Sequence, residues 1–372
     1  MDVTFSDEQE LLRKSAREFL TERCPPDLIH AVAAGKAEDR IDDLWRRMAE
    51  LGWMGLGIPE SYGGAGSSLL DVALLAEEMG RALVPAPWFS TVCLAGEAIA
   101  ATGTEEQKAK WLPKIAAGEL RATVAIAEPD ARPGADGIGA RASAVKGSFR
   151  LDGTKAFVTD LPAADHVVVA ALLDDEPALF ILDGQELSAG KEPSLDSTRP
   201  VGTLELSGME VSSDRLLGDG PCGWTTIEST LDRAAAVLSA EMCGGSEKML
   251  DDSVAYAKQR HQFGRPIGSF QGVSHRCAEM LLEIEGARSL TYYAAWCADE
   301  DPESAGLAAS SAKAAAGDAF RSCTAQAIQI HGGIGFTWEA GLHFWYRRAF
   351  GSASLLGDAA YHRERVAELL GP

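Results

Sequence analysis

Residues 260–271 read Arg-His-Gln-Phe-Gly-Arg-Pro-Ile-Gly-Ser-Phe-Gln and join two long helical segments. Gly264 and Pro266 end the first of these segments, because glycine favours helix ends and proline cannot continue a helix. Apolar residues recur at spacings of three and four in three long segments around this joint, residues 231–257, 272–298 and 305–329. Long helices in this succession predict a helical bundle in the C-terminal part of the chain.

The rest of the chain divides into a helical part and a β-rich part. Short helical patterns fill the first 120 residues, and Ser6 with Gln9 three positions later predicts a capping box. Residues 121–223 hold short β-rich runs punctuated by glycine, proline, aspartate and serine, which is typical of an antiparallel sandwich or barrel. The order α, β, α without βαβ units predicts an α+β protein with three domains, residues 1–120, 121–223 and 224–372.

The composition narrows the class of protein. The 372 residues carry 34 Lys and Arg against 55 Asp and Glu, a net charge of −21, and 46% of them are hydrophobic. A chain of this length is too long to fold around a single hydrophobic core. Its apolar content is too high for a disordered protein. The acidic excess argues against a nucleic-acid partner or a polybasic membrane surface, because both need a basic face. Seven scattered cysteines, no apolar leader and no membrane-spanning run predict a soluble, cytoplasmic protein.

Several common motifs are missing. The sequence has no G-x-G-x-x-G directly after a strand pattern, no P-loop and no G-x-S-x-G, so a Rossmann domain, a P-loop domain and a serine nucleophile are unsupported. The seven histidines show no metal-ligand spacing, and we expect no metal site. The Gly332-Gly333-Ile-Gly335 cluster follows a helix and by itself indicates a helix stop.

One carboxylate, Glu241, stands apart from the other acidic residues. Its neighbours three and four positions away on the same helix face are uncharged: Val237, Leu238, Gly244 and Gly245. Two alternatives stay open for Glu241, an exposed or interhelically salt-bridged side chain, or a buried one with a raised pKa in a space that the glycines leave open. By contrast, Glu279 and Glu283 lie one turn apart on a helix that also carries Arg276 and Arg288, and we expect a solvated charged face there.

A second cluster of candidates lies at the joint between the long helices. Arg260, Arg265 and Gln271 converge there, and guanidinium groups suit a pyrophosphate. A basic loop that interacts with helix C-terminal carbonyls accounts for the same residues equally well.

Four motifs in order along the chain resemble those of the acyl-CoA dehydrogenase family. They are Ala127-Glu-Pro129 with Gly134-Ala-Asp136, Leu151-Asp-Gly-Thr-Lys-Ala-Phe-Val-Thr159, Tyr256-Ala-Lys-Gln-Arg-His-Gln-Phe-Gly264 with Ser269-Phe-Gln271, and Gln329-Ile-His-Gly-Gly-Ile-Gly-Phe336. The resemblance covers essentially the whole chain. It implies an N-terminal helical domain, a central β-domain and a C-terminal four-helix bundle, with FAD bound across a subunit interface.

The resemblance also assigns cofactor and substrate residues by position. Phe157 replaces the family's usual Trp beside the isoalloxazine. Thr159 matches a residue whose hydroxyl forms a hydrogen bond with the flavin near N5. Ala127 occupies the position where a Thr usually forms a hydrogen bond with the flavin. Ala135 occupies the position where a Ser usually contacts the CoA-side chain. The positions that hold the pyrophosphate and adenosine of the neighbouring subunit's FAD are matched by Arg260, Phe263, Gln271, Gln329, Gly332 and Gly333.

The position of the catalytic base departs from the usual family pattern. Many members carry a Glu immediately before a Gly, after an Arg-Asp pair; this chain has Leu356 there, after Arg347-Arg348. Leucine cannot take a proton, although its backbone N–H can still donate to a thioester carbonyl. Other members carry the base on the first long helix of the bundle, about two turns or roughly 11 Å before Glu241. The resemblance therefore favours Glu241 as the base.

The implied reaction is α,β-dehydrogenation of an acyl-CoA thioester to the trans-2-enoyl-CoA, as in β-oxidation of fatty acids or steroid side chains. The base removes the α-proton and the β-hydrogen leaves as hydride to flavin N5. The implied partners are the acyl-CoA, an electron-transferring flavoprotein as acceptor, and subunits of a homodimer, a homotetramer or a heterotetramer with a related chain. Two alternatives stay open: a catalytically silent, cofactor-supporting subunit of a heteromeric acyl-CoA dehydrogenase, and an oxidase or monooxygenase on the same fold.

Overall fold

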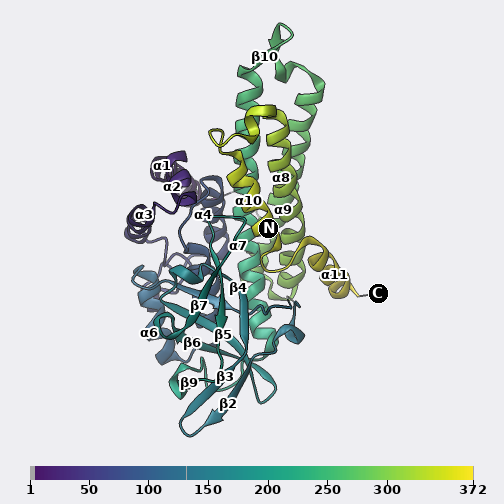
Figure 1. Ribbon diagram of the computed structural model, residues 1–372. Coiled ribbons are helices and arrows are strands. Elements are labelled where there is room, and N and C mark those ends of the chain that lie inside the picture. The colour runs from purple at the N-terminus through teal and green to yellow at the C-terminus, as the bar shows by residue number, and fades with distance from the viewer. Residues whose placement is uncertain (1–4, 131, 372) are drawn as a thin grey trace. The chain divides into compact units, whose positions relative to one another are not determined.

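A computed structural model describes residues 5–130 and 132–371 (Figure 1). The chain divides into two compact units, each made of segments that are not contiguous in sequence. We name residues 1–38, 68–85 and 235–372 the helical unit, and residues 39–67 and 86–234 the mixed unit. The strands of the mixed unit follow the N-terminal helices and precede the long C-terminal helices, which confirms the α+β class and the α, β, α order. The three-domain division stays a prediction.

The helical unit contains the bundle. Its long helices are α7 (Gly223–Gln259), which begins in the mixed unit, α8 (Gln271–Glu300), α9 (Pro302–His331) and α10 (Leu342–Ser354). Buried side chains from all four helices share one apolar core: Met249, Leu250, Met280, Ile284, Cys323, Ala327, Ile330 and Leu342. This shared core confirms the predicted bundle and makes α10 its fourth helix.

Shorter helices complete the helical unit. They are α1 (Asp7–Arg23), α2 (Pro26–Ala33), α4 (Leu69–Arg81) and α11 (Ala359–Leu370), with the short η8 (Gly332–Phe336) after α9. The predicted capping box begins α1, because the Gln9 N–H donates to the Ser6 hydroxyl and the Gln9 side chain accepts from the Ser6 N–H. Ser68 and Asp71 form the same motif at α4.

The mixed unit holds two sheets and several short helices. The helices are α3 (Glu38–Glu50), α5 (Glu97–Thr102) and α6 (Glu105–Ala116). The larger sheet has the order β1-β5-β2-β3-β9 with β6 paired to β5, and the smaller has the order β4-β8-β7. The strands are β1 (Ala122–Ala125), β2 (Arg141–Val145), β3 (Ser148–Asp152), β4 (Thr154–Thr159), β5 (His166–Leu173), β6 (Glu176–Asp183), β7 (Ser188–Glu192), β8 (Val201–Glu205) and β9 (Met209–Ser212).

The strand pairing is mainly antiparallel, as predicted, with two exceptions. β1 and β2 both run parallel to β5. Neither joins β5 through a hairpin, and long connections make parallel pairing available.

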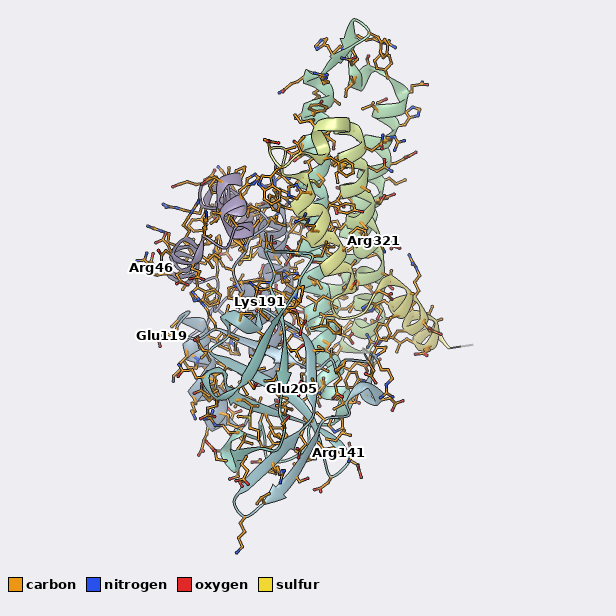
Figure 2. All side chains as sticks on the ribbon, in the orientation of Figure 1. Arg46, Glu119, Arg141, Lys191, Glu205 and Arg321 are labelled. Carbon is orange, nitrogen blue, oxygen red and sulfur yellow. The ribbon has the colours of Figure 1, made fainter. Side chains whose placement is uncertain are left out.

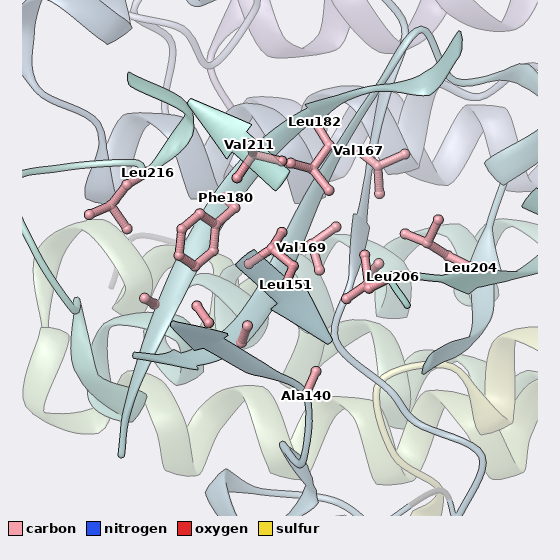
Figure 3. Packing of buried hydrophobic residues seen from close by; sticks show 14 of the residues in the cluster. Ala140, Leu151, Val167, Val169, Phe180, Leu182, Leu204, Leu206, Val211 and Leu216 are labelled. Atoms are coloured by element: carbon pink, nitrogen blue, oxygen red, sulfur yellow. The ribbon is translucent and has the colours of Figure 1, made fainter. Parts of the chain in front are cut away.

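One apolar core is shared by the two sheets (Figure 3). Leu151, Val169 and Phe180 come from the larger sheet, whereas Val158 and Leu204 come from the smaller one. All five side chains are buried. Because Val158 belongs to this core, the strand β4 that carries two candidate flavin residues is held firmly.

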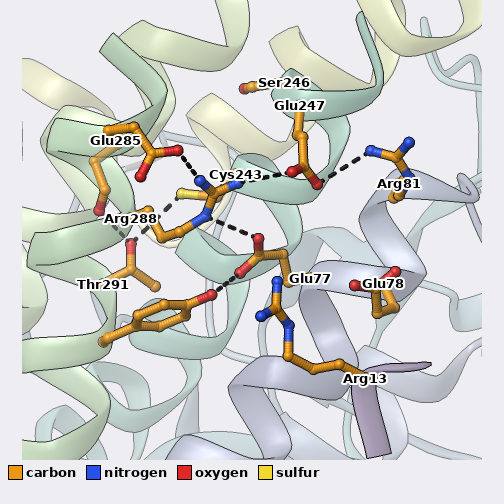
Figure 4. A network of polar contacts seen from close by, with 12 residues as sticks. Arg13, Glu77, Glu78, Arg81, Cys243, Ser246, Glu247, Glu285, Arg288 and Thr291 are labelled. Carbon is orange, nitrogen blue, oxygen red and sulfur yellow. Dashed lines mark hydrogen bonds and ion pairs between the residues drawn. The ribbon is translucent and has the colours of Figure 1, made fainter. Parts of the chain in front are cut away.

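A polar network that was not predicted is buried in the helical unit (Figure 4). Arg288 of α8 has a side chain only 13% exposed, and its Nε lies 2.9 Å from Oε1 of Glu77 on α4. Arg288 also pairs with Glu285, and the Tyr292 hydroxyl donates to Glu77. Burial raises the pKa of Glu77, while Arg288 opposes the shift. Glu279 and Glu283 are exposed, as expected for a solvated charged face, whereas Arg288 on the same helix is mostly buried because its partner Glu77 lies on a distant segment of sequence.

Charged side chains such as Arg46, Glu119 and Lys191 lie on the surface (Figure 2). Within residues 5–130 and 132–371, every helix is too short or too polar to cross a membrane. In the same described part of the chain, no three His, Cys, Asp or Glu side chains gather in a way that could hold a metal ion.

Candidate functional site

Strand β4 carries two of the candidate flavin residues, Phe157 and Thr159. Its pairing with β8 shifts register between Lys155 and Val158, which marks a bulge, and Phe157 within the bulge has a φ of 56°. A left-handed φ is rare for a bulky residue and persists only where the surrounding structure holds it. The Phe157 ring is 55% exposed, whereas Thr159 is buried at the end of the strand. The bulge therefore presents an aromatic ring on the surface of the mixed unit.

Ala127, a third flavin candidate, lies beside this strand. The N–H of Ala156 on β4 donates to the Ala127 carbonyl over 2.9 Å. Lys155 of β4 is fully buried, and its Nζ donates to the Ile126 carbonyl at 3.0 Å and pairs with Glu128 at 2.7 Å. Burial lowers the pKa of Lys155, and Glu128 opposes this shift. The contacts of Lys155 with Ile126 and Glu128 thus hold the segment around Ala127 against β4.

Lys155 and Glu128 are not among the residues singled out from the sequence. The available signal for Lys155 is a charged residue inside an otherwise β-rich motif, because a charge in such a strand is rarely buried without a partner. The substrate candidate Ala135 opens the short η3 (Ala135–Gly137) of the same unit and is exposed. Its methyl group offers no hydrogen bond, so only its backbone or packing could contribute.

The joint between α7 and α8 is a small β-hairpin that carries more candidates. His261 pairs with Pro266 and Gln262 with Arg265, which leaves Phe263 and Gly264 as a two-residue loop. Both loop residues have positive φ, 54° and 79°, as a type I′ turn requires. Phe263 is 91% exposed at the tip.

Two basic residues of this hairpin have different surroundings. The Arg265 guanidinium lies over the Phe270 ring, 4.1 Å from its centroid. Arg260 follows the end of α7 and is exposed, and among the described residues no carboxylate lies within ion-pair distance of it. Gln271 begins α8 and is also exposed. Arg260 therefore remains available for an external anion, whereas Arg265 already has an aromatic partner.

Gln329, Gly332 and Gly333 form an open surface at the end of α9. All three are exposed, and a Cβ atom added to either glycine would meet nothing within 4 Å. Gly332 has a φ of 63° and caps the end of α9, which confirms the predicted helix stop at this cluster. An exposed backbone of this kind leaves room for close approach of a ligand.

These residues fit a dinucleotide such as FAD in their chemistry. Arg260 offers a planar guanidinium for a pyrophosphate, and the amides of Gln271 and Gln329 donate and accept hydrogen bonds. Gly332 and Gly333 leave open space beside the backbone at the start of η8. The candidates that match the flavin end, Ala127, Phe157 and Thr159, lie in the mixed unit, and those that match the pyrophosphate and adenosine lie in the helical unit.

Glu241 lies on α7 within the helical unit and is 6% exposed. Arg348 of α10 donates from Nη1 to Oε1 of Glu241 over 3.0 Å, and its Nη2 donates to the Val84 carbonyl at 3.4 Å. The interhelical ion pair is therefore present, and the side chain is buried as well. The carboxylate of Glu241 therefore faces a guanidinium inside the helical unit.

The glycines near Glu241 do not leave the open space beside it that is expected from the sequence. A Cβ on Gly244 would lie 1.8 Å from the Glu77 carbonyl oxygen, and a Cβ on Gly245 would lie 2.5 Å from the Phe320 ring. On the facing helix, a Cβ on Gly80 would lie 1.9 Å from the Glu241 carbonyl oxygen. Gly80 and Gly244 thus let the backbones of α4 and α7 approach closely, and the space expected beside Glu241 is filled.

Leu356, at the family's usual base position, lies in the turn between α10 and α11. Its φ is 62° and its side chain is half-buried. Lys313 of α9 and His362 of α11 donate to backbone carbonyls of this turn. Neither residue is singled out by the sequence; a lysine inside an alanine-rich helix segment is the one local signal for Lys313.

Comparison with known proteins agrees with the motifs. Family models of the acyl-CoA dehydrogenase N-terminal and C-terminal domains match residues 6–119 and 222–371. Acyl-CoA dehydrogenase IpdE2 of Mycobacterium tuberculosis is 35% identical over 357 residues, which cover 95% of this chain and 94% of that protein. Butyryl-CoA dehydrogenase from Megasphaera elsdenii has a similar structure, with a TM-score of 0.90, 30% identity and 100% of both chains covered.

A heteromeric protein is also among the similar structures. The ChsE4-ChsE5 complex from Mycobacterium tuberculosis contains a chain with a TM-score of 0.91 and 27% identity, again covering 100% of both chains. Two domain models that together span most of the sequence, relatives at this level of identity and the shared fold all lead to one assignment. The chain belongs to the acyl-CoA dehydrogenase family, whose members are FAD-binding flavoprotein oxidoreductases.

Proposed function

We propose that the chain catalyses α,β-dehydrogenation of an acyl-CoA thioester to the trans-2-enoyl-CoA, with Glu241 as the base. The observation that carries this proposal is the position of Glu241, a buried carboxylate that accepts a hydrogen bond from Arg348. A base must be deprotonated before it acts, and a buried site excludes the water that would weaken it. When bound, FAD supplies the acceptor for the hydride that leaves the β-carbon.

The α-proton of a thioester is only weakly acidic, so the protein must stabilise the negative charge of the developing enolate. A backbone N–H close to the thioester oxygen stabilises that charge. The amide of Leu356 is the proposed donor, because replacing a glutamate by leucine changes the side chain and leaves the N–H. Glu241 then takes the proton on a carboxylate oxygen, and Arg348 keeps the only charge of the pair.

For the cofactor, we propose that Arg260, Gln271 and Gln329 hold the pyrophosphate and adenosine end beside Phe263, Gly332 and Gly333. Phe157 packs beside the flavin ring, with Thr159 and Ala127 near it. Ala135 lies along the CoA-side chain. An electron-transferring flavoprotein is the proposed electron acceptor. A dimer or tetramer, of this chain alone or with a related chain, would bring the two halves of each FAD site together.

Replacing Arg260 by Met is expected to lower FAD affinity roughly 10- to 100-fold, because a charge-assisted hydrogen bond to phosphate contributes about 1.5–3 kcal/mol. The measurement is flavin fluorescence during titration of the apoprotein with FAD. Arg265→Met is the matched control from the same hairpin, since the Arg265 guanidinium is engaged by Phe270. Equal losses in the two variants would contradict the assignment of Arg260, and so would an unchanged affinity in Arg260→Met.

A second candidate function is favoured by two specific observations. Leu356 occupies the usual base position, and the Glu241 carboxylate is already engaged in an ion pair with Arg348. Both would suit a catalytically silent subunit that supports FAD in a heteromeric acyl-CoA dehydrogenase. The similarity to a chain of the ChsE4-ChsE5 complex is compatible with this role.

The visible spectrum of the chain purified alone separates the two candidates. Under nitrogen, a panel of acyl-CoA thioesters from short chains to bulky ring systems is added, and loss of flavin absorbance is recorded. Stoichiometric flavin that bleaches with one member of the panel supports the dehydrogenase and identifies the acyl class. A colourless chain, or one whose flavin does not bleach, supports the cofactor-supporting subunit. Rapid recolouring in air without another acceptor would instead indicate an oxidase.

A further inference from the structure

Lys313 of α9 is a fully buried amine whose hydrogen-bond partners are backbone carbonyls. Its Nζ donates to the Ala353 carbonyl at 3.0 Å and to the Gly357 carbonyl at 2.8 Å. No carboxylate lies within ion-pair distance of Nζ in the described part of the chain. Burial lowers the pKa of Lys313 to about 7, and Asp358 opposes the shift. Protonated or neutral, the amine has at least two N–H donors, so both carbonyls stay satisfied.

His362 of α11 binds a backbone carbonyl in the turn between α10 and α11, the turn that also contains Gly357. Its Nε2 lies 3.0 Å from the Leu356 carbonyl, and because a carbonyl only accepts, Nε2 carries the hydrogen. Its Nδ1 lies 3.3 Å from the Ser310 hydroxyl, which accepts from Arg365 and can donate its own hydrogen to Nδ1. Burial, together with the nearby Lys313, lowers the pKa of His362 to about 4. The imidazole is therefore neutral near pH 7, and its donor to Leu356 is fixed.

The turn that these two side chains hold has an unusual backbone. Leu356 has a φ of 62° and Gly357 a φ of 101°. The neighbouring amides of Leu355 and Gly357 donate to the Gly351 and Ser354 carbonyls, whereas the Leu356 N–H has no acceptor among the described residues. With its carbonyl anchored and its φ fixed, the direction of the Leu356 N–H is fixed too, since each residue has only two soft dihedral angles.

We infer that Lys313 and His362 are positioning residues, which hold the turn at residues 355–358 so that the Leu356 N–H stays free to bind the thioester oxygen of an acyl-CoA. The inference rests on the proposed function, in which the Leu356 amide is the carbonyl donor. It explains why an unpaired lysine is buried at this place, a costly arrangement that packing alone does not require. It also explains how a non-glycine residue keeps a left-handed conformation.

The test compares flavin-loaded variants of the whole protein. His362→Leu removes the donor to the Leu356 carbonyl, His362→Gln keeps a side-chain N–H, and Lys313→Met removes the amine and keeps the stem. Arg321→Met, an exposed change on α9, is the control. The first readout is the infrared stretching frequency of a ¹³C-labelled thioester carbonyl in the bound acyl-CoA. The second is the split of the rate of flavin reduction into kcat and KM.

In His362→Leu and Lys313→Met we expect the carbonyl frequency to move toward its value in water and kcat to fall roughly 10²- to 10³-fold, as when one oxyanion donor is lost. KM and flavin content should change little, and His362→Gln should recover part of both effects. A carbonyl frequency and kcat equal to those of the wild type in folded His362→Leu would overturn the inference, even if Lys313→Met does not fold. If the wild-type flavin is not reduced but the carbonyl frequency still depends on His362, the proposed dehydrogenation fails and the positioning role stands.

Discussion

In Glu241→Gln, we expect an acyl-CoA to reduce the bound flavin roughly 10²- to 10⁴-fold more slowly than in the wild type, which is the usual contribution of a general base. Glutamine keeps the shape of the side chain and can still accept from Arg348, but it cannot take the α-proton. The measurement is the loss of flavin absorbance after rapid mixing with saturating acyl-CoA under nitrogen. Flavin content should stay at the wild-type level, because Glu241 is not among the proposed cofactor residues.

A control comes from a second Glu–Arg pair, which is partly buried. Arg233 Nε lies 2.8 Å from Oε2 of Glu97, with side chains 27% and 23% exposed. Glu97→Gln also removes one carboxylate from an ion pair, yet it should leave the reduction rate within about twofold of the wild type. Equal slowing in both variants would indicate a general loss of structure, and undiminished reduction in Glu241→Gln would remove Glu241 from the mechanism.

Replacing Arg288 by Met should destabilise the protein by about 3–5 kcal/mol, because a buried carboxylate loses its charged partner. Glu77 would keep the Tyr292 hydroxyl, which cannot neutralise a carboxylate. The measurement is the free energy of unfolding from denaturant titration. The Glu77→Gln/Arg288→Met double variant removes both charges and should recover a large part of the loss.

An exposed ion pair supplies the comparison for this stability experiment. Arg363 pairs with Asp318 on the surface, and Arg363→Met should change the free energy of unfolding by less than about 1 kcal/mol. If Arg288→Met were as mild as Arg363→Met, the buried network of Figure 4 would have no structural importance. A double variant less stable than either single variant would contradict the pairing of Glu77 with Arg288.

Features with local signals could be predicted from the sequence. Gly264 and Pro266 mark the joint of the bundle, and α7 ends at Gln259 just before them. Ser6 and Gln9 mark the start of α1 by a three-residue spacing. The ordered motifs likewise placed the chain in its family, because each motif is a short contiguous pattern.

Features that depend on distant contacts or on backbone strain could not be predicted. Arg348 lies 107 positions from Glu241, so no spacing on α7 indicates that these two side chains meet. The left-handed φ of Phe157 has no signal in a run of Ala, Phe and Val, because a bulge is set by pairing with β8. The glycines beside Glu241 suggested empty space, whereas a neighbouring helix and an aromatic ring fill it.

The Glu241→Gln/Arg348→Gln double variant separates a base from a structural partner. In Glu241→Gln the Arg348 guanidinium faces a neutral amide in place of a carboxylate, so removing both charges should return stability toward the wild type. The decisive measurement is single-turnover reduction of the flavin in this double variant by an acyl-CoA that bleaches the wild type. If Glu241 is the base, the double variant regains stability and its flavin stays oxidised. Bleaching that returns together with stability would show that Glu241 serves only as the counter-ion of Arg348.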